Sequence, residues 1–140
     1  MKIFIVLIFF IYASSCAPVY KKLQPKSKIT VLDIKGAPIY DAEVILHSNA
    51  KPVGFERSRE IKSTNYDGMV SFDSKREWRV ETILLHGSEY YFWNWCVTKT
   101  GYETFVTNHS SANDFEKNMI VNLIKGLTTP CPNDVHFRVN

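Results

Sequence analysis

The sequence contains few residues in the spacings that metal and catalytic sites need. Its four histidines, His47, His86, His109 and His136, form no pair at ligand spacing, and no C-x-x-C or H-E-x-x-H motif occurs. No serine lies in a G-x-S-x-G elbow. These absences argue against a zinc site and a serine hydrolase, so we expect no metal, no cofactor and no catalytic residues.

The chain also lacks a strong charge imbalance. It has 17 Lys and Arg against 14 Asp and Glu, a formal net charge of +3, and the basic residues are dispersed. Nucleic-acid binding needs a concentrated basic surface, so no nucleic-acid partner is expected. The densest positive stretch, Lys21, Lys22, Lys26 and Lys28, lies against anionic lipid headgroups or forms a solvated linker.

No apolar run is long enough to cross a bilayer. The strongest one covers residues 3–12, whereas a spanning helix needs about 20 residues. Lys2 precedes this run, and Ala13-Ser14-Ser15-Cys16 follows it. A cationic start, a short apolar core and small residues before a cut indicate a cleaved export signal over residues 1–15. An uncut N-terminal anchor is the alternative.

Cys16, directly after the small residues, resembles the lipobox cysteine of bacterial lipoproteins. In that family the cysteine is acylated and becomes the first residue of the mature protein. Ala13 departs from the family pattern, which prefers Leu or another aliphatic residue there. Ala17 is not the Asp that resembles an inner-membrane retention signal, so the resemblance implies an outer-membrane anchor facing the periplasm of a bacterium. Removal of residues 1–15 leaves 125 residues, enough for one domain, with a formal net charge of +2.

The lipobox resemblance also bears on the remaining cysteines. If Cys16 carries lipid, Cys96 and Cys131 are an even pair in an oxidising compartment. We expect them to form a disulfide, which closes a loop of about 35 residues and contributes roughly 3.8 kcal/mol on the chain-entropy model. Two free thiols are the alternative.

The rest of the chain shows a β pattern without a convincing helix. Residues 16–27 hold two prolines and few apolar side chains, which predicts a lipidated tether. Period-two alternation and turn residues predict strands at 28–34, 42–47, 56–64, 69–72, 78–85, 90–98, 103–107 and 118–124. A helix over 74–86 is the local alternative. The count predicts a seven- to eight-stranded antiparallel β-sandwich, with a small barrel as the alternative, and an irregular tail over 126–140.

Three blocks in order resemble carboxypeptidase regulatory-like domains. They are V-L-D-I-K-G-A-P-I-Y-D-A-E-V-I-L (31–46), T-N-Y-D-G-M-V-S-F (64–72) and V-T-K-T-G-Y-E (97–103). They are similar to the family's G-x-P-[IVL]-x-x-A-x-V turn, its T-x-x-x-G-x-x-x-F hairpin and its V-x-K-x-G-Y-E strand end. The resemblance covers residues 28–125 and implies a transthyretin-like (Ig-like) sandwich. The family pattern lacks a tail and cross-link like those expected here.

The most aromatic stretch is residues 90–95. Alternation places Trp93, Trp95 and Val97 on one face of a strand, which we assign to the core. Tyr90, Phe92 and Cys96 point the other way, so the tail would be stapled across the outer face of this sheet. Tyr90 and Phe92 are therefore candidate ligand-contact aromatics, or they are covered by the tail.

Three classes of function remain open from the sequence. The first is a non-catalytic envelope lipoprotein that serves as a protein-interaction or structural accessory module. The second is a glycan- or small-ligand-binding module that uses exposed aromatics, as in starch-binding-like relatives of the fold. The fold alone also suggests a secretion-system lipoprotein or a transthyretin-like hydrolase acting on hydroxyisourate. That hydrolase family ends in Tyr-Arg-Gly-Ser, whereas this chain ends in V-H-F-R-V-N (135–140), so we expect no enzyme.

Overall fold

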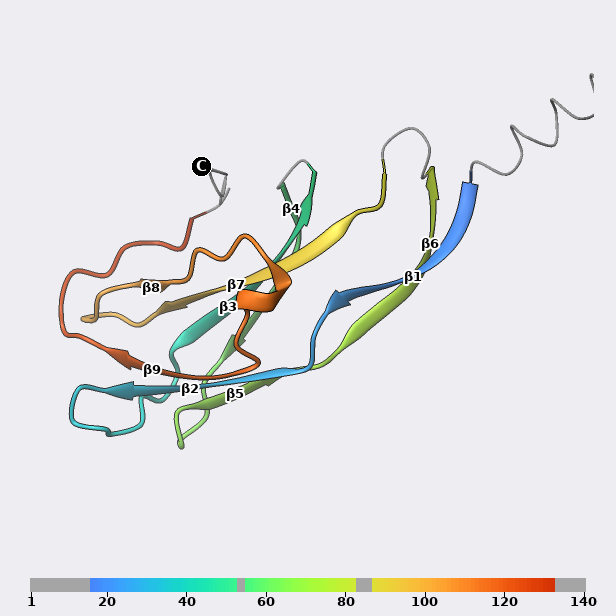
Figure 1. Ribbon diagram of the computed structural model, residues 1–140. Coiled ribbons are helices and arrows are strands. Elements are labelled where there is room, and N and C mark those ends of the chain that lie inside the picture. The colour runs from blue at the N-terminus through green and yellow to red at the C-terminus, as the bar shows by residue number, and fades with distance from the viewer. Residues whose placement is uncertain (1–15, 53–54, 83–86, 133–140) are drawn as a thin grey trace, which may run out of the picture.

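The computed structural model describes residues 16–52, 55–82 and 87–132 and is all-β (Figure 1). The strands are β1 (Cys16–Gln24), β2 (Ser27–Asp33), β3 (Glu43–Lys51), β4 (Phe55–Ser63), β5 (Met69–Phe72), β6 (Lys75–Thr82), β7 (Tyr90–Thr98), β8 (Phe105–Val106) and β9 (Asn118–Leu123). One 3-10 turn, η1, covers Ala112–Asp114. β6 excludes the helix considered for its segment, although residues 83–85 of the expected strand lie outside the described ranges.

Two sheets form a sandwich around one core. The three-stranded sheet has the order β5-β2-β9, and the four-stranded sheet has the order β4-β3-β7-β8. Trp93, Trp95 and Val97 point from β7 into the space between them, which confirms their assignment to the core. The rings of Trp95 and Phe72 meet edge-on across the sandwich, with centroids 5.3 Å apart. β4, whose sequence is mostly polar, is an edge strand.

The sheets are mainly antiparallel, but β9 pairs with β2 in parallel, from Lys28↔Asn118 to Asp33↔Leu123. An entirely antiparallel sandwich was therefore a wrong expectation. Between β7 and β9 the chain passes through β8 and η1, and this long connection returns it to the end at which β2 starts. Val121 and Leu123 still face the core, as their alternation predicts.

The turn at residues 65–68 forms as predicted, but it does not close a hairpin. Gly68 N donates to Asn65 O at 2.9 Å, and the Asn65 side chain accepts from Met69 N at 2.8 Å. β4 pairs with β3, whereas β5 pairs with β2, so the turn carries the chain from one sheet to the other. Gly68 has φ +70°, and a Cβ there would overlap the carbonyl oxygen of Val31. The glycine therefore allows both the turn and its close approach to the backbone of β2.

The segment expected to be a tether is instead β1. It pairs antiparallel with β6, from Cys16↔Thr82 to Gln24↔Lys75, and the two strands form a ribbon that extends away from the sandwich (Figure 1). The ribbon continues the β2–β5 pairing across an interruption at Pro25, which has no N–H to donate to a ladder. The prediction failed because the lysines of β1 suggested a solvated segment, whereas Lys21 forms an ion pair with Glu81 of β6.

Candidate functional site

Cys16, the expected lipidation site, is the first residue of β1 and pairs with Thr82. It therefore stands at the far end of the ribbon. The expected signal peptide, residues 1–15, lies outside the described part of the chain.

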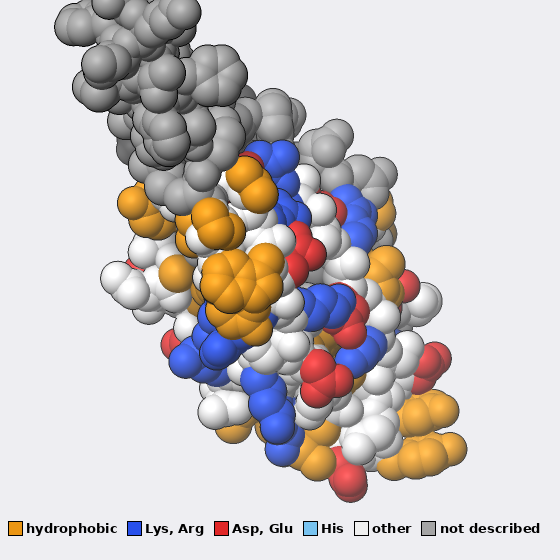
Figure 2. All heavy atoms as spheres, turned by 90° about the vertical axis from the view of Figure 1, so that its right-hand side faces the viewer, with side chains coloured by type: hydrophobic (Ala, Val, Ile, Leu, Met, Phe, Trp, Pro, Cys, Tyr) orange, Lys and Arg blue, Asp and Glu red, His pale blue; other side chains and the backbone are white. Residues whose placement is uncertain are grey.

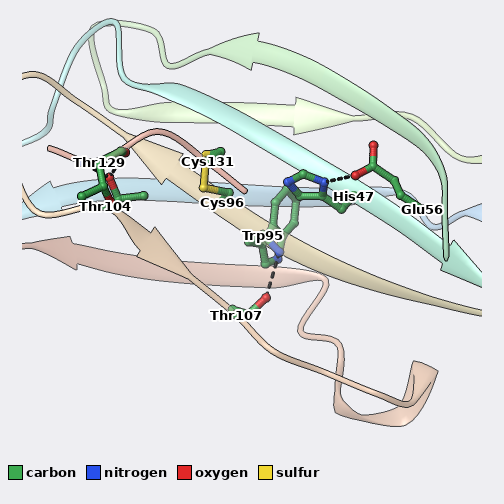
Figure 3. Close-up of a disulfide and its surroundings, with 8 residues drawn as sticks. All are labelled: His47, Glu56, Trp95, Cys96, Thr104, Thr107, Thr129 and Cys131. Carbon is green, nitrogen blue, oxygen red and sulfur yellow. Dashed lines mark hydrogen bonds and ion pairs between the residues drawn. A yellow bond between two sulfur atoms is a disulfide. The ribbon is translucent and has the colours of Figure 1, made fainter. Parts of the chain in front are cut away.

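Cys96 and Cys131 form a disulfide, with their Cα atoms 6.0 Å apart (Figure 3). Cys96 lies on the face of β7 opposite to the core residues, so the cross-link is on the outer side of the four-stranded sheet. Thr128 adds polar contacts: its hydroxyl lies 2.8 Å from the carbonyl oxygen of Tyr102 and accepts from Gly101 N at 3.0 Å. These contacts confirm the expected staple for the tail up to residue 132; residues 133–140 of the predicted tail lie outside the described ranges.

A buried imidazole paired with a half-buried carboxylate lies on the same outer face (Figure 3). His47 Nδ1 is 2.9 Å from Glu56 Oε2, and Arg59 Nε donates to Glu56 Oε1 at 2.5 Å. A proton on Nδ1 is positioned to be donated to this carboxylate. His47 Nε2 is buried and has no hydrogen-bond partner among the residues that the structure describes. The pair fixes the orientation of one imidazole beneath the surface of the sheet.

The predicted ligand-contact aromatics line a shallow cavity of about 400 Å³, but only one of them is exposed. Tyr90 is 71% exposed, whereas Phe92 is 2% exposed and lies in the interior of the central strand β7, with Lys51 Nζ 5.9 Å from its ring centroid. The expectation that Phe92 is a surface aromatic was therefore wrong. Residues 110–113 complete the wall with two serines and an asparagine. An aromatic face opposite hydroxyl and amide groups is suited to a small polar ligand.

An ionic network borders this cavity at the start of β7. Glu89 accepts from Tyr91 Oη at 3.0 Å and pairs with Arg57, while Arg79 donates to Tyr91 Oη at 2.6 Å. Burial and the hydrogen bond to Glu89 raise the pKa of Tyr91 to about 12, so the phenol keeps its proton at physiological pH. Glu89 therefore holds the ribbon and β7 together, through Arg79 on one side and Tyr91 on the other.

A half-buried carboxylate, Glu60, lies where the ribbon joins the sandwich. Gln24 Nε2 donates to Glu60 Oε2 at 2.7 Å and to Asp73 O at 2.9 Å, and Lys75 lies 2.7 Å from Glu60. Burial opposes ionisation of Glu60, but hydrogen bonds from Lys75, Gln24 and Lys62 outweigh it and lower its pKa to about 2. The junction is therefore fixed by charge-assisted hydrogen bonds.

Two exposed aromatic pairs were missed at the level of sequence. Tyr20 of β1 and Trp78 of β6 are cross-strand neighbours, with ring centroids 5.1 Å apart. Tyr40 and Tyr66 stack face to face, with centroids 4.3 Å apart and an interplanar angle of 4°. The alternation of residues 78–85 placed Trp78 and Val80 on one face, but it did not indicate which face is exposed. No sequence signal connects Tyr40 with Tyr66, because the fold of two sheets brings their loops together.

Within the described ranges, no group of three or more His, Cys, Asp or Glu side chains is arranged to hold a metal ion. The same part of the chain contains no helix with the length and apolar character needed to cross a membrane.

Comparisons with known proteins find no matching family model, no matching curated protein and no matching solved structure.

Proposed function

We propose that this protein is a bacterial envelope lipoprotein, anchored through an acylated Cys16, whose β-sandwich is a non-catalytic interaction or structural module. The location of Cys16 carries the proposal. It is the first residue of a strand at the tip of a ribbon, so an acyl group there would join the lipid directly to a folded element. The Cys96–Cys131 disulfide supports an oxidising compartment such as the periplasm.

The proposed partner surface lies at the opposite end of the molecule. β1 and β2 follow one another from Cys16 to Asp33, and Tyr40 lies in the loop after β2. At about 3.3 Å per residue, the two strands span at most on the order of 55 Å. The stacked Tyr40–Tyr66 pair is therefore held away from an anchor at Cys16. Exposed tyrosines are enriched in interfaces because they combine a large apolar area with a polar group.

Membrane fractionation tests the anchor. Wild-type protein is expected in the outer-membrane fraction, and Cys16→Ala is expected to lose both acylation and this location. Identical partitioning of the two proteins would refute lipid anchoring.

Crosslinking in intact cells tests the partner surface. A Tyr40→Ala/Tyr66→Ala double variant is expected to lose crosslinked products that persist in Tyr102→Phe, a conservative change at a half-buried tyrosine that is not part of the pair. An unchanged product pattern would exclude this surface.

A glycan- or small-ligand-binding module is the second candidate, and the Tyr90 cavity favours it. Tyr90 offers an exposed ring face beside Ser110, Ser111 and Asn113, which supply hydroxyl and amide groups for a sugar. Titration with peptidoglycan and polysaccharide fragments is expected to perturb the NMR resonances of Tyr90 and residues 110–113. The absence of any shift across a broad panel would remove this candidate.

We further propose that the sandwich is a divergent member of the carboxypeptidase regulatory-like, transthyretin-like group. The support is the all-β sandwich and the three ordered sequence blocks around Gly36, Gly68 and Gly101, each of which has positive φ in the structure. An experimental structure with a different strand connectivity from that family would refute the assignment.

A further inference from the structure

The β1–β6 ribbon has two faces of different character. In an antiparallel pair, residues directly opposite each other project from the same face. Pro18↔Val80, Tyr20↔Trp78 and Lys22↔Arg76 therefore share one face, which we call the outer ribbon face. Val19↔Arg79 and Lys21↔Glu77 share the other, inner face.

The inner face is bound to the rest of the molecule. Lys21 Nζ lies 2.5 Å from Ser88 Oγ and 3.1 Å from Glu81 Oε1. Arg79 contacts Tyr91, and Trp93 Nε1 donates to Leu23 O at 2.8 Å. These contacts neutralise the charges of the inner face and fix which face of the ribbon is turned outward.

On the outer ribbon face, exposed aromatic side chains lie beside a group of cations. Trp78 and Val80 are 70% and 71% exposed, and Tyr20 is 51% exposed. Lys22, Arg76 and Lys117 gather at one end; burial and the positive charges of Lys117 and Arg76 lower the pKa of Lys22. Across the described residues, no ion pair involves any of these three cations. Figure 2, which views this end of the molecule, shows a group of orange side chains beside the grey residues, with blue side chains next to it.

The extent of this face argues against a protein partner. The Pro18–Val80 pair and the Lys22–Arg76 pair are four residues apart along each strand. At roughly 7 Å for every two residues, the face between them is about 14 Å long. Its width is two strands, so it offers an area of order 200 Å². A stable protein interface needs about 800 Å² from each partner. A bilayer requires no such closed, complementary area.

The chemistry of the face matches a phospholipid surface. Trp and Tyr are enriched at the membrane–water interface, where the ring is buried and the polar group stays hydrated. Lys and Arg beside them are attracted to anionic headgroups. Cys16 is the first residue of β1, two residues before Pro18 of this face. An acyl chain attached at that end of the ribbon would therefore enter the bilayer next to this face.

We propose that the outer ribbon face, with Pro18, Tyr20, Trp78 and Val80 as its apolar part and Lys22, Arg76 and Lys117 as its cationic end, rests on an anionic phospholipid leaflet. This inference rests on the proposed lipid anchor. It assigns the ribbon a second membrane contact, which fixes the orientation of the sandwich relative to the bilayer. Each cation near an anionic surface increases partitioning roughly five-fold, so the three together contribute roughly 100-fold.

Trp78 provides the test, because Trp93 and Trp95 are buried in the core. The lipoprotein is purified from membranes and reconstituted into vesicles of phosphatidylethanolamine and phosphatidylglycerol, with or without chains brominated near the headgroup. Brominated chains are expected to quench the tryptophan fluorescence of the wild type and to have much less effect on that of Trp78→Phe. This variant keeps an aromatic ring on the face, so it removes the probe with little change to the surface. Vesicle flotation is measured on the same samples and reports on the anchor separately.

The outcomes separate the two proposals. Equal quenching of wild type and Trp78→Phe in protein that floats would overturn the membrane-contact inference and leave the anchor intact. The inference would also be overturned if acrylamide and brominated lipid both failed to quench the fluorescence of Trp78. That result would show that a protein, and not lipid, covers this residue. Protein that does not float would refute the anchor and, with it, this inference.

A charge variant makes the test more specific. Lys22→Gln/Arg76→Gln is expected to reduce the quenching by brominated lipid, and 0.5 M NaCl is expected to reduce it in the wild type. Lys35→Gln/Lys125→Gln removes the same charge from exposed positions outside the ribbon and is expected to behave like the wild type. Equal effects of the two double variants would contradict the assigned contact.

Discussion

Removal of the Cys96–Cys131 disulfide by Cys131→Ala is expected to destabilise the folded domain by about 3.8 kcal/mol. The bond closes a segment with a sequence separation of 35, and the loop-closure entropy that it removes from the unfolded chain gives this value. Cys131 is on the tail, so its replacement leaves the buried Cys96 and the core around Trp95 in place. At roughly 0.25 kcal/mol per kelvin for a domain of this size, the melting temperature should fall by about 15 °C.

The measurement is urea and thermal unfolding of oxidised wild type, reduced wild type and Cys131→Ala. Reduced wild type is the control, since it should superimpose on the variant if the bond alone accounts for the change. Coincident transitions of oxidised wild type and Cys131→Ala would refute the reasoning, because they would show that the tail is held without help from the cross-link. Hydrogen bonds between the Thr128 hydroxyl and the turn at residues 99–102 are the contacts that would then hold the tail.

Three further predictions concern single sites. Glu60→Gln should lower the free energy of unfolding at pH 7 by about 2 kcal/mol. This is less than the full pKa shift of Glu60 would give, because Lys75, one of its partners, is half exposed and the pair is screened by solvent. Since the folded pKa of Glu60 is about 2, this difference should shrink as the pH falls below about 4.5 and vanish near pH 2; a difference that is independent of pH would contradict the assigned role. Gly68→Ala should destabilise by more than about 2 kcal/mol, because positive φ and the Val31 carbonyl both oppose a Cβ, whereas Gly87→Ala, with open space around its Cβ, should cost less in the same melts. Asn94→Ala should lower the free energy of unfolding by about 2 kcal/mol and speed amide hydrogen exchange at residues 107–109. The reason is that the buried Asn94 side chain accepts from His109 N at 2.6 Å and from Thr107 Oγ1 at 3.0 Å. Unchanged exchange would show that other contacts hold this segment.

Local alternation was sufficient to predict the core. Trp93, Trp95 and Val97 lie two residues apart in one strand, and each is buried between the sheets. The opposite direction of Cys96 then predicted that the tail crosses the outer face, because a disulfide can form only on the side to which its cysteines point. These inferences needed only the period of a strand, which each residue obeys regardless of the rest of the fold.

The pairing of strands could not be predicted in the same way. The turn at residues 65–68 has the same chemistry whether it closes a hairpin or joins two sheets, and only the partners of β4 and β5 decide between them. The parallel pairing of β9 with β2 depends on the route of the chain through β8 and η1. Burial of Phe92 likewise depends on the neighbours of β7 in the folded sheet, whereas alternation gives only the direction of its side chain.

The ribbon connects the missed strand to function. Lys21 and Lys22 are adjacent and chemically identical, and sequence reasoning treated them alike as part of a solvated or headgroup-facing stretch. In the folded ribbon they project from opposite faces, and Lys21 is ion-paired with Glu81 while Lys22 lies beside Arg76 and Lys117. Because Gln24 and Glu60 fix the junction, the face that carries Lys22 cannot rotate independently of the sandwich. An anchor at Cys16 would therefore determine both the distance of the Tyr40–Tyr66 pair from the lipid and the direction in which that pair is presented to a partner.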